Sequence, residues 1–347
     1  MAARPDVRSL LNLLSPRLRA LPLLVLYITD GCNSRCVMCD IWKLPRRNME
    51  MALAERLAGA FGAFGGRAVV LSGGEAMQHP EWPRIATLFR AAGASVGLLT
   101  NGLALQKQAH EVIAHIDSVT VSLDAADPET YRAIRGVDAL PRVLAGIRAV
   151  AEAGIPVTTR TTVQRANFRE IPRIVDVALE AGARRTSFLA LDVSNPEAFG
   201  PRFDPDHLPI LAHSNALTPD ELPAFAAVLA ELERTHAADF AAGRIAESPA
   251  KLRRLYDYFA AVNGLVPFDA PRCNAPHISA VIEVDGTLRP CFFLPAVGNA
   301  ADAPLVEALN TSDAQTMRMA YRAGKREECE RCVCPLYRGP RALLRGL

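Results

Sequence analysis

Residues 23–40 read LLVLYITDGCNSRCVMCD, an apolar run that leads directly into three cysteines. Leu23 to Ile28 is continuously apolar, as expected for a strand buried on both faces, and Pro22 before it suits the first position of a strand. Cys32, Cys36 and Cys39 follow with the spacing C-x3-C-x2-C. A buried strand that ends in a thiol-rich loop predicts a metal or cofactor site at the end of that strand.

After this segment the chain alternates strand and helix patterns as far as residue 191, which predicts an α/β fold with a parallel sheet. Further strands are predicted at 68–71, 96–99, 118–123, 156–163 and 186–191, and helices at 51–64, 81–92, 105–115, 141–153 and 171–181. We therefore expect a partial (β/α)6 barrel of the TIM type. In such barrels the carboxyl ends of the strands carry the chemistry, so the cysteine loop and the glycine-rich ends of neighbouring strands should share one rim.

The remaining chain divides around this barrel. We expect a helical segment at 1–21, the barrel at 22–195, a loop and helical linker at 196–265, and a small C-terminal α+β domain at 266–347. The linker begins with a Pro-rich loop at 196–209, and residues 218–221 have the form of a capping box. A hairpin is predicted at 279–293 with Asp285-Gly286 as its turn.

Composition places the chain among ordinary globular proteins. It has 347 residues, of which 50% are hydrophobic and 22% charged, and its net charge is 39 − 37 = +2. This near balance gives no general reason to expect a nucleic-acid partner. No stretch approaches the roughly 18–20 apolar residues of a transmembrane segment, and none has the form of a secretory signal. We therefore expect a cytoplasmic location, where disulfides are rare and clustered cysteines indicate metal binding or catalysis.

All eight cysteines fall into two groups. The second group is Cys273, Cys291, Cys329, Cys332 and Cys334, and residues 40–272 contain none. Structural zinc takes four ligands, whereas the first group offers three thiolates and leaves one position open. A [4Fe–4S] cube held by three thiolates likewise has one iron without a protein ligand. For the second group, zinc is an alternative to an iron–sulfur cluster.

The cysteine spacing after the first strand and Ser72-Gly73-Gly74-Glu75 after the second resemble the radical S-adenosylmethionine (SAM) superfamily, over about residues 23–191. Met38 departs from the pattern, because many members carry an aromatic residue there. The resemblance implies a [4Fe–4S] cluster whose open iron binds SAM. It also implies reductive cleavage of SAM to a 5′-deoxyadenosyl radical, which removes a hydrogen atom from substrate.

The same resemblance implies roles for residues on the rim. Gly73, Gly74 and Glu75 would bind the methionyl amine of SAM, and Ser122 and Asp124 match positions that face its ribose and carboxylate. Arg135 resembles a cation that some members direct at the SAM carboxylate, and Asn101 has a similar rim position. No residue is indicated as the catalytic base, and a turn or a solvated helix surface would also explain several of these residues.

The C-terminal cysteines are similar to the Twitch and SPASM extensions of this superfamily. Cys273-x12-Gly286-x4-Cys291 followed by Cys329-x2-Cys332 would hold one auxiliary [4Fe–4S] cluster for electron transfer. Cys334 is then surplus, although it could replace Cys332 as the fourth ligand.

The substrate is the least specified feature. Peptide-modifying relatives commonly carry a leader-binding domain before the barrel, and only 22 residues precede the first strand here, so we expect a small-molecule substrate. A ribosomal peptide is an alternative. A lipid is another, if the helix with Leu10, Leu11, Leu14 and Leu18 lies on a membrane, although we expect it to close the bottom of the barrel. An electron donor such as flavodoxin or ferredoxin is the expected protein partner. A non-enzymatic iron–sulfur carrier and a zinc-binding interaction module are rivals from other classes.

Overall fold

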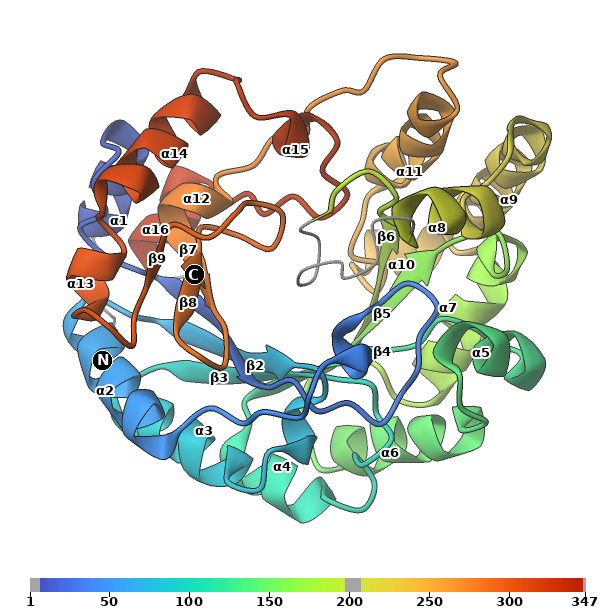
Figure 1. The fold of residues 1–347 in the computed structure, drawn as a ribbon. Coiled ribbons are helices and arrows are strands. Elements are labelled where there is room, and N and C mark those ends of the chain that lie inside the picture. Colours follow the sequence, from blue (N-terminus) through green and yellow to red (C-terminus); the bar gives the residue numbers. More distant parts are fainter. Residues whose placement is uncertain (1–6, 197–206, 346–347) are drawn as a thin grey trace.

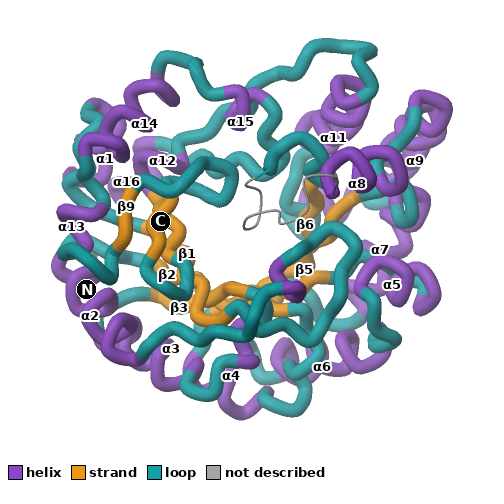
Figure 2. The backbone as a smooth tube through the Cα atoms, in the orientation of Figure 1, coloured by secondary structure: helices purple, strands orange, loops and turns teal. Residues whose placement is uncertain are grey.

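The barrel is an arc of six parallel strands in chain order. The computed structural model describes residues 7–196 and 207–345. Neighbouring strands pair in parallel throughout, and their bounds are β1 (Leu23–Thr29), β2 (Ala68–Gly73), β3 (Ser95–Thr100), β4 (Ser118–Ser122), β5 (Val157–Val163) and β6 (Arg185–Ala190). The strands line the inside of the arc and helices surround it (Figures 1 and 2). The predicted partial (β/α)6 barrel is confirmed.

Helices cover the outer face of the sheet through buried apolar stripes. They are α2 (Met51–Ala63), α3 (Trp82–Ala91), α4 (Ala109–His115), α5 (Pro128–Arg135), α6 (Leu140–Glu152) and α7 (Ile171–Glu180). Phe61 of α2 and Phe89 of α3, for example, are fully buried and meet edge-on at 5.8 Å. The sequence pattern did not indicate α5. Its N-cap is Asp127, whose carboxylate accepts hydrogen bonds from the backbone N–H groups of Glu129 and Thr130.

The C-terminal hairpin continues the barrel sheet. Strand β7 (Ser279–Ile282) pairs in parallel with β1, and β8 (Thr287–Arg289) and β9 (Gly298–Asn299) follow in antiparallel pairing. The sheet therefore has nine strands in the order β6-β5-β4-β3-β2-β1-β7-β8-β9. Gly286 adopts a φ of +88° in the Asp285-Gly286 turn, a conformation that favours glycine. The C-terminal domain thus covers the edge of β1, which would otherwise present unpaired backbone groups.

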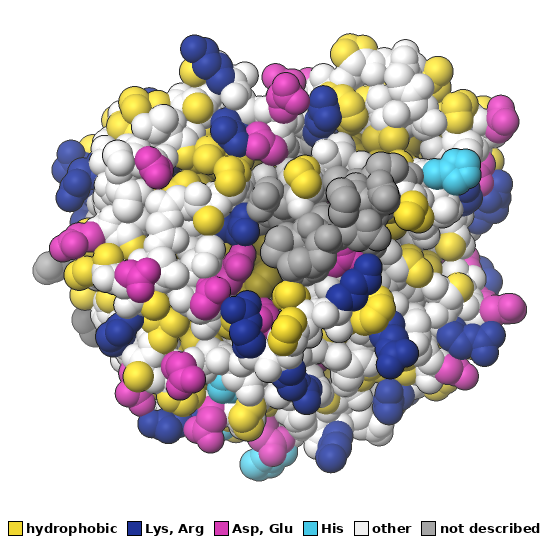
Figure 3. Space-filling view, viewed as in Figure 1, with side chains coloured by type: hydrophobic (Ala, Val, Ile, Leu, Met, Phe, Trp, Pro, Cys, Tyr) yellow, Lys and Arg dark blue, Asp and Glu magenta, His cyan; other side chains and the backbone are white. Residues whose placement is uncertain are grey.

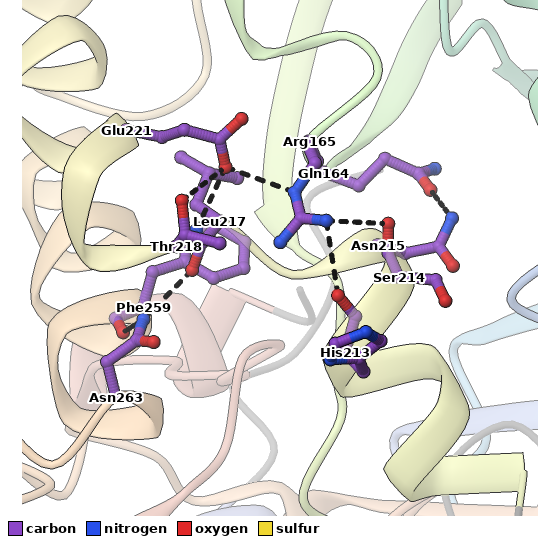
Figure 4. A network of polar contacts seen from close by, with 10 residues as sticks. All are labelled: Gln164, Arg165, His213, Ser214, Asn215, Leu217, Thr218, Glu221, Phe259 and Asn263. Carbon is purple, nitrogen blue, oxygen red and sulfur yellow. Dashed lines mark hydrogen bonds and ion pairs between the residues drawn. The ribbon is translucent and has the colours of Figure 1, made fainter.

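The described part of the linker after β6 consists of helices joined by short loops. Its helices are α8 (His207–Asn215), α9 (Leu222–Thr235), α10 (Ala237–Ala241) and α11 (Pro249–Val262). Figure 4 shows how Arg165, just after β5, links α8 to the start of α9: its Nε donates to Glu221 at 3.1 Å, and its Nη1 donates to the carbonyls of His213 and Ser214. The predicted capping box around Glu221 is present. Most of the predicted Pro-rich loop lies outside the described residues.

The N-terminal segment packs against the C-terminal domain. Helix α1 (Val7–Leu11) contacts α16 (Pro340–Arg345), and the 3-10 turn at Asn12–Leu14 contacts α12 (Ala275–Ile278). The helix predicted through Leu18 is shorter than expected, because the helical part ends before Pro16. Leu14 is 75% exposed, whereas Leu18 is buried in the main core. Buried Arg318, in α14 (Ser312–Arg322), donates hydrogen bonds to the carbonyls of Pro16, Pro276 and Leu309.

The described helices do not include a span that could cross a membrane.

Candidate active site

The first three cysteines lie on a loop that is fixed by the end of α5. The backbone N–H groups of Arg35 and Val37 donate to the carbonyls of Arg135 and Ile134, at 3.1 and 3.0 Å. Helix α5 stops at Gly136 with a φ of +68°, where a side-chain Cβ would lie 2.7 Å from the carbonyl oxygen of Arg35. The loop that carries Cys32, Cys36 and Cys39 therefore rests directly on a glycine-capped helix end.

The glycine pair after β2 holds the other side of this loop. Gly74 donates its N–H to the carbonyl of Thr29, and Glu75 donates to the carbonyl of Gly31, both at 2.8 Å. A Cβ at Gly73, whose φ is +131°, would lie 2.2 Å from the carbonyl oxygen of Thr29, and one at Gly74 would lie 2.5 Å from that of Gly31. Two adjacent residues without side chains are thus needed for this backbone contact.

Glu75 is a buried acceptor at the centre of the rim. Its carboxylate accepts hydrogen bonds from the Thr100 hydroxyl at 2.8 Å, from the Asn101 N–H at 2.6 Å and from the Met77 N–H at 3.2 Å. Burial raises the pKa of Glu75, and these hydrogen bonds oppose the rise. The side chain of Asn101 in turn donates to the side-chain oxygen of Asn33 at 2.8 Å, which links the end of β3 to the cysteine loop.

A buried ion pair joins the ends of β4 and α5 to Cys36. The Arg135 guanidinium lies 2.8 Å from the Asp124 carboxylate, and its Nη1 donates to Cys36 Sγ at 3.2 Å. Asp124 also accepts from the Thr162 N–H at 2.7 Å. Burial raises the pKa of Asp124, and the charge of Arg135 opposes the rise. The ion pair therefore places one Arg135 nitrogen against a cysteine of the loop.

These elements enclose a cavity of about 250 Å³. The predicted site residues that line it are Cys32, Cys36, Cys39, Gly73, Gly74, Glu75, Asn101, Ser122 and Arg135, whereas Asp124 lies outside its wall. Buried polar atoms of lining residues that have no hydrogen-bond partner within the described chain include Ser34 Oγ, Arg135 Nη2 and Arg160 Nε. Such atoms indicate a polar ligand, and the amine, carboxylate and ribose of SAM fit this need.

The five C-terminal cysteines line a second cavity, of about 540 Å³. They come from the segment before α12, the end of β8, the short helix α15 (Glu327–Glu330) and the loop after it. Burial is the main cause that raises the pKa of Cys329 to about 12, and the nearby Cys273 adds to it. Thiols of this kind become thiolates when a metal binds them. Across the described residues, no group of three or more His, Cys, Asp or Glu side chains is placed to hold a single metal ion.

Arg160 of β5 is a site residue that the sequence reasoning missed. Its Nη1 lies 3.5 Å from Cys334 Sγ. Both residues line the two cavities above and a third, of about 330 Å³, beside α11. The sequence feature that could have indicated Arg160 is its place in the middle of VTTRTTV, a strand expected to be buried, where a charged side chain is unusual. Arg160 and Cys334 therefore lie where the space around the first three cysteines meets the space around the other five.

Comparison with known families matches both cysteine groups. Residues 26–178 match the radical SAM superfamily, and residues 273–333 match SPASM, described as an iron–sulfur cluster-binding domain. The second match favours an iron–sulfur cluster over zinc at the C-terminal cysteines.

Several characterised relatives are similar over the barrel. An AdoMet-dependent heme synthase of Methanosarcina barkeri is 33% identical over 162 residues, covering 45% of this chain and 46% of the relative. A PqqA peptide cyclase of Streptomyces rochei is 30% identical, covering 51% and 49%. A GTP 3′,8-cyclase of Rhodopseudomonas palustris is 35% identical, covering 45% and 49%. The chain thus matches about half the length of these curated relatives.

Solved structures share the fold over most of the chain. Streptococcus suis SuiB bound to S-adenosylmethionine has a TM-score of 0.63 at 17% identity, covering 92% of this chain and 74% of that one. The anSMEcpe structure with AdoMet and the Kp18Cys peptide also has a TM-score of 0.63, at 16% identity, covering 92% and 91%. At these identities the likeness establishes the fold. The two domain matches imply that the cofactors are SAM, a [4Fe–4S] cluster and auxiliary iron–sulfur binding. The chain therefore belongs to the radical SAM superfamily and carries a SPASM-type iron–sulfur domain.

Proposed function

We propose that this chain reductively cleaves SAM and uses the resulting 5′-deoxyadenosyl radical to remove a hydrogen atom from a substrate. The observation that carries the proposal is the cavity in which three cysteines, without a fourth protein ligand in the motif, face the Gly-Gly-Glu turn and a cationic side chain. When bound, the [4Fe–4S] cluster supplies the electron that breaks the C5′–S bond of SAM. The protein's own part is to bind SAM, orient it and exclude water from the radical.

Glu75 is proposed to accept a hydrogen bond from the methionyl ammonium. A carboxylate has about four acceptor positions, and three donors within the chain already occupy Glu75, which leaves about one for a ligand. Arg135 Nη2 is the proposed donor to the SAM carboxylate, and Ser122 the donor to its carboxylate or ribose. Asp124 is assigned a positioning role, because it contacts the Arg135 guanidinium from outside the cavity.

The substrate is proposed to react in the space around Arg160 and Cys334. Both the SAM cavity and the auxiliary cavity open to these residues, so a substrate there would lie between the radical and an electron acceptor. A small molecule stays the prediction for the substrate class. Modification of a peptide is the second candidate, because one relative over the barrel is a PqqA peptide cyclase.

The auxiliary [4Fe–4S] cluster is proposed to be held by Cys273, Cys291, Cys329 and Cys332. These four cysteines line the same cavity as Tyr321, whose hydroxyl donates a hydrogen bond to the Cys273 carbonyl. Cys334 is instead the cysteine that contacts Arg160. A cluster with four thiolates has no open iron, and it would accept the surplus electron of a dehydrogenation.

Cleavage of SAM tests the proposed function directly. The reduced, iron-reconstituted enzyme should form 5′-deoxyadenosine from SAM, measured by mass spectrometry. Replacing Cys32, Cys36 and Cys39 together by Ala should abolish this product and remove about four irons, one cube, while the auxiliary irons remain. A triple variant that still cleaves SAM would refute the assignment of this loop.

Glu75→Gln should weaken SAM binding about ten- to hundredfold while iron content is unchanged, because a charge-assisted hydrogen bond is worth about 1.5–3 kcal/mol. Because the pKa of Glu75 is raised, its ionised form is lost as pH falls through a pKa above the ordinary value of 4.5, and SAM affinity should fall with it. In Glu75→Gln this pH dependence should disappear. Exposed Glu129→Gln serves as the control. If the Glu75 variant and the control bind SAM with equal affinity, Glu75 only stabilises the turn after β2 and does not bind SAM.

Iron and sulfide analysis tests the auxiliary ligand set. The intact chain should contain about eight irons and eight sulfides, as expected for two cubes. Cys334→Ala should keep all of them, whereas Cys332→Ala, two residues away, should lose up to four. If Cys334→Ala loses iron and Cys332→Ala does not, the fourth ligand has been misassigned. Four irons with one zinc would rule out an auxiliary cluster.

A further inference from the structure

We propose that Arg160 binds an oxyanion group of the substrate, a carboxylate or a phosphate, so that this active site takes an anionic substrate. The proposal rests on the proposed function, because it names the substrate class for the same space between the two cysteine groups. Arg160 and Cys334 each line all three cavities described above. A group that Arg160 binds would therefore lie where these cavities meet.

Strand β5 places Arg160 beside the cavity assigned to SAM. In the parallel pairing of β4 with β5, Arg160 stands opposite Ser122. Thr162, the next residue on the same face of β5, also lines the SAM cavity. Neighbouring strands lie about 4.7–4.9 Å apart. The oxyanion would thus be held one strand away from Ser122, which keeps the rest of a small substrate close to SAM.

The positive charge of Arg160 has no carboxylate partner among the described residues. Its Nη1 contacts Cys334 Sγ at 3.5 Å, and sulfur is a weak acceptor. Its Nε is buried and has no hydrogen-bond partner in the described chain. Arg135, by contrast, pairs with Asp124 at 2.8 Å. A guanidinium stays charged at physiological pH, and its planar fork of donors matches the oxygens of a carboxylate or phosphate. The donors of Arg160 therefore suit an oxyanion.

The third cavity provides room for the remainder of the substrate. Its volume is about 330 Å³, and its walls come from β6, α11 and the loop after α15. Helix α11 packs against β6, on the side of the barrel where β5 and β6 end the arc of strands (Figure 1). Pockets that bind small molecules commonly measure about 300–1,000 Å³. A compact molecule with one end on Arg160 would therefore fit this cavity.

The acids on the wall of the third cavity are partly neutralised within the chain. The Glu247 carboxylate accepts hydrogen bonds from the Ser187 hydroxyl at 2.8 Å and from the Phe188 N–H at 2.9 Å. Asp269 pairs with Arg254 at 3.1 Å. Figure 3 shows Lys, Arg, Asp and Glu side chains around the centre of the face viewed in Figure 1, so the surface carries both signs of charge there. We therefore assign the selection of an anion to Arg160 inside the molecule.

The test uses the rate at which Cys334 is alkylated in the iron-reconstituted full chain, because its sulfur lies beside Arg160. Iodoacetate and iodoacetamide attack the same thiolate and differ in charge, so a change in thiol reactivity cancels in the ratio of their rates. In Arg160→Gln the ratio of the iodoacetate rate to the iodoacetamide rate, measured by peptide mass spectrometry, should fall roughly tenfold or more. The matched control is Arg173→Gln, the same charge change at an exposed position of α7, which should leave the ratio unchanged.

Protection of the unmodified enzyme gives a measurement that needs no variant. Glutarate or inorganic phosphate should slow the alkylation of Cys334 by iodoacetate in a saturable way, whereas glutaramide, the neutral diamide, should not. The stronger protector identifies the oxyanion as a carboxylate or a phosphate. Arg160→Lys should keep part of this protection, because lysine retains the charge and lacks the planar fork of donors.

The proposal is overturned by an unchanged ratio in Arg160→Gln, by an equal fall in Arg173→Gln, or by the absence of protection by both anions. It is also overturned if Cys334 reacts with neither reagent, because Cys334 would then be a cluster ligand or Arg160 would be out of reach of an anion. Roughly tenfold weaker SAM binding by Arg160→Gln would assign Arg160 to SAM instead. Formation of 5′-deoxyadenosine by the unmodified enzyme is measured separately, so a failure of the proposed function is distinguishable from a failure of anion binding.

Discussion

The active site depends on one backbone contact between neighbouring strands. The end of β2 lies so close to the end of β1 that Gly73 and Gly74 have no room for side chains, and Gly74 and Glu75 donate hydrogen bonds to the carbonyls of Thr29 and Gly31. Thr29 and Gly31 are the residues that lead into the cysteine loop. The spacing of two parallel strands, which the core of the barrel fixes, therefore sets where the cysteine loop begins. The end of α5 then holds the middle of the loop at Arg35 and Val37.

Buried charges orient the cysteine loop, and their desolvation lowers the stability of the fold unless other contacts compensate. Asp124 and Arg135 form an ion pair with both side chains almost fully buried, and removing one partner of such a pair commonly costs about 3–5 kcal/mol. The pair offers little stability over a packed apolar pair. It does, however, hold the Arg135 guanidinium against Cys36 and leave the buried Nη2 without a hydrogen-bond partner in the described chain. We interpret the ion pair as a contact that fixes the position of the Arg135 guanidinium, as three hydrogen bonds fix the position of the buried Glu75 carboxylate.

The sequence was sufficient for the features that depend on local pattern. The alternation of strands and helices, the motif after β1 and the turn after β2 each lie within one short segment, so their periodicity and spacing could be recognised. Three features could not be predicted, because they depend on contacts between distant residues. The pairing of β7 with β1 joins segments more than 200 residues apart. The contact of Arg160 with Cys334 depends on the register of β5, and the place of Asp124 outside the cavity depends on how α5 returns Arg135 to the rim.

We propose that the loop of Cys32, Cys36 and Cys39 holds a cluster with one open iron, and that SAM binds this iron from the cavity beside Glu75. The decisive measurement is electron–nuclear double resonance on the reduced enzyme, with isotope labels in the amino group and carboxylate of SAM. Cys291→Ala would be used to remove the auxiliary signal. We expect hyperfine coupling from both labelled groups to the cluster signal. A cluster signal that shows no coupling to either group, under conditions in which SAM is bound, would contradict it.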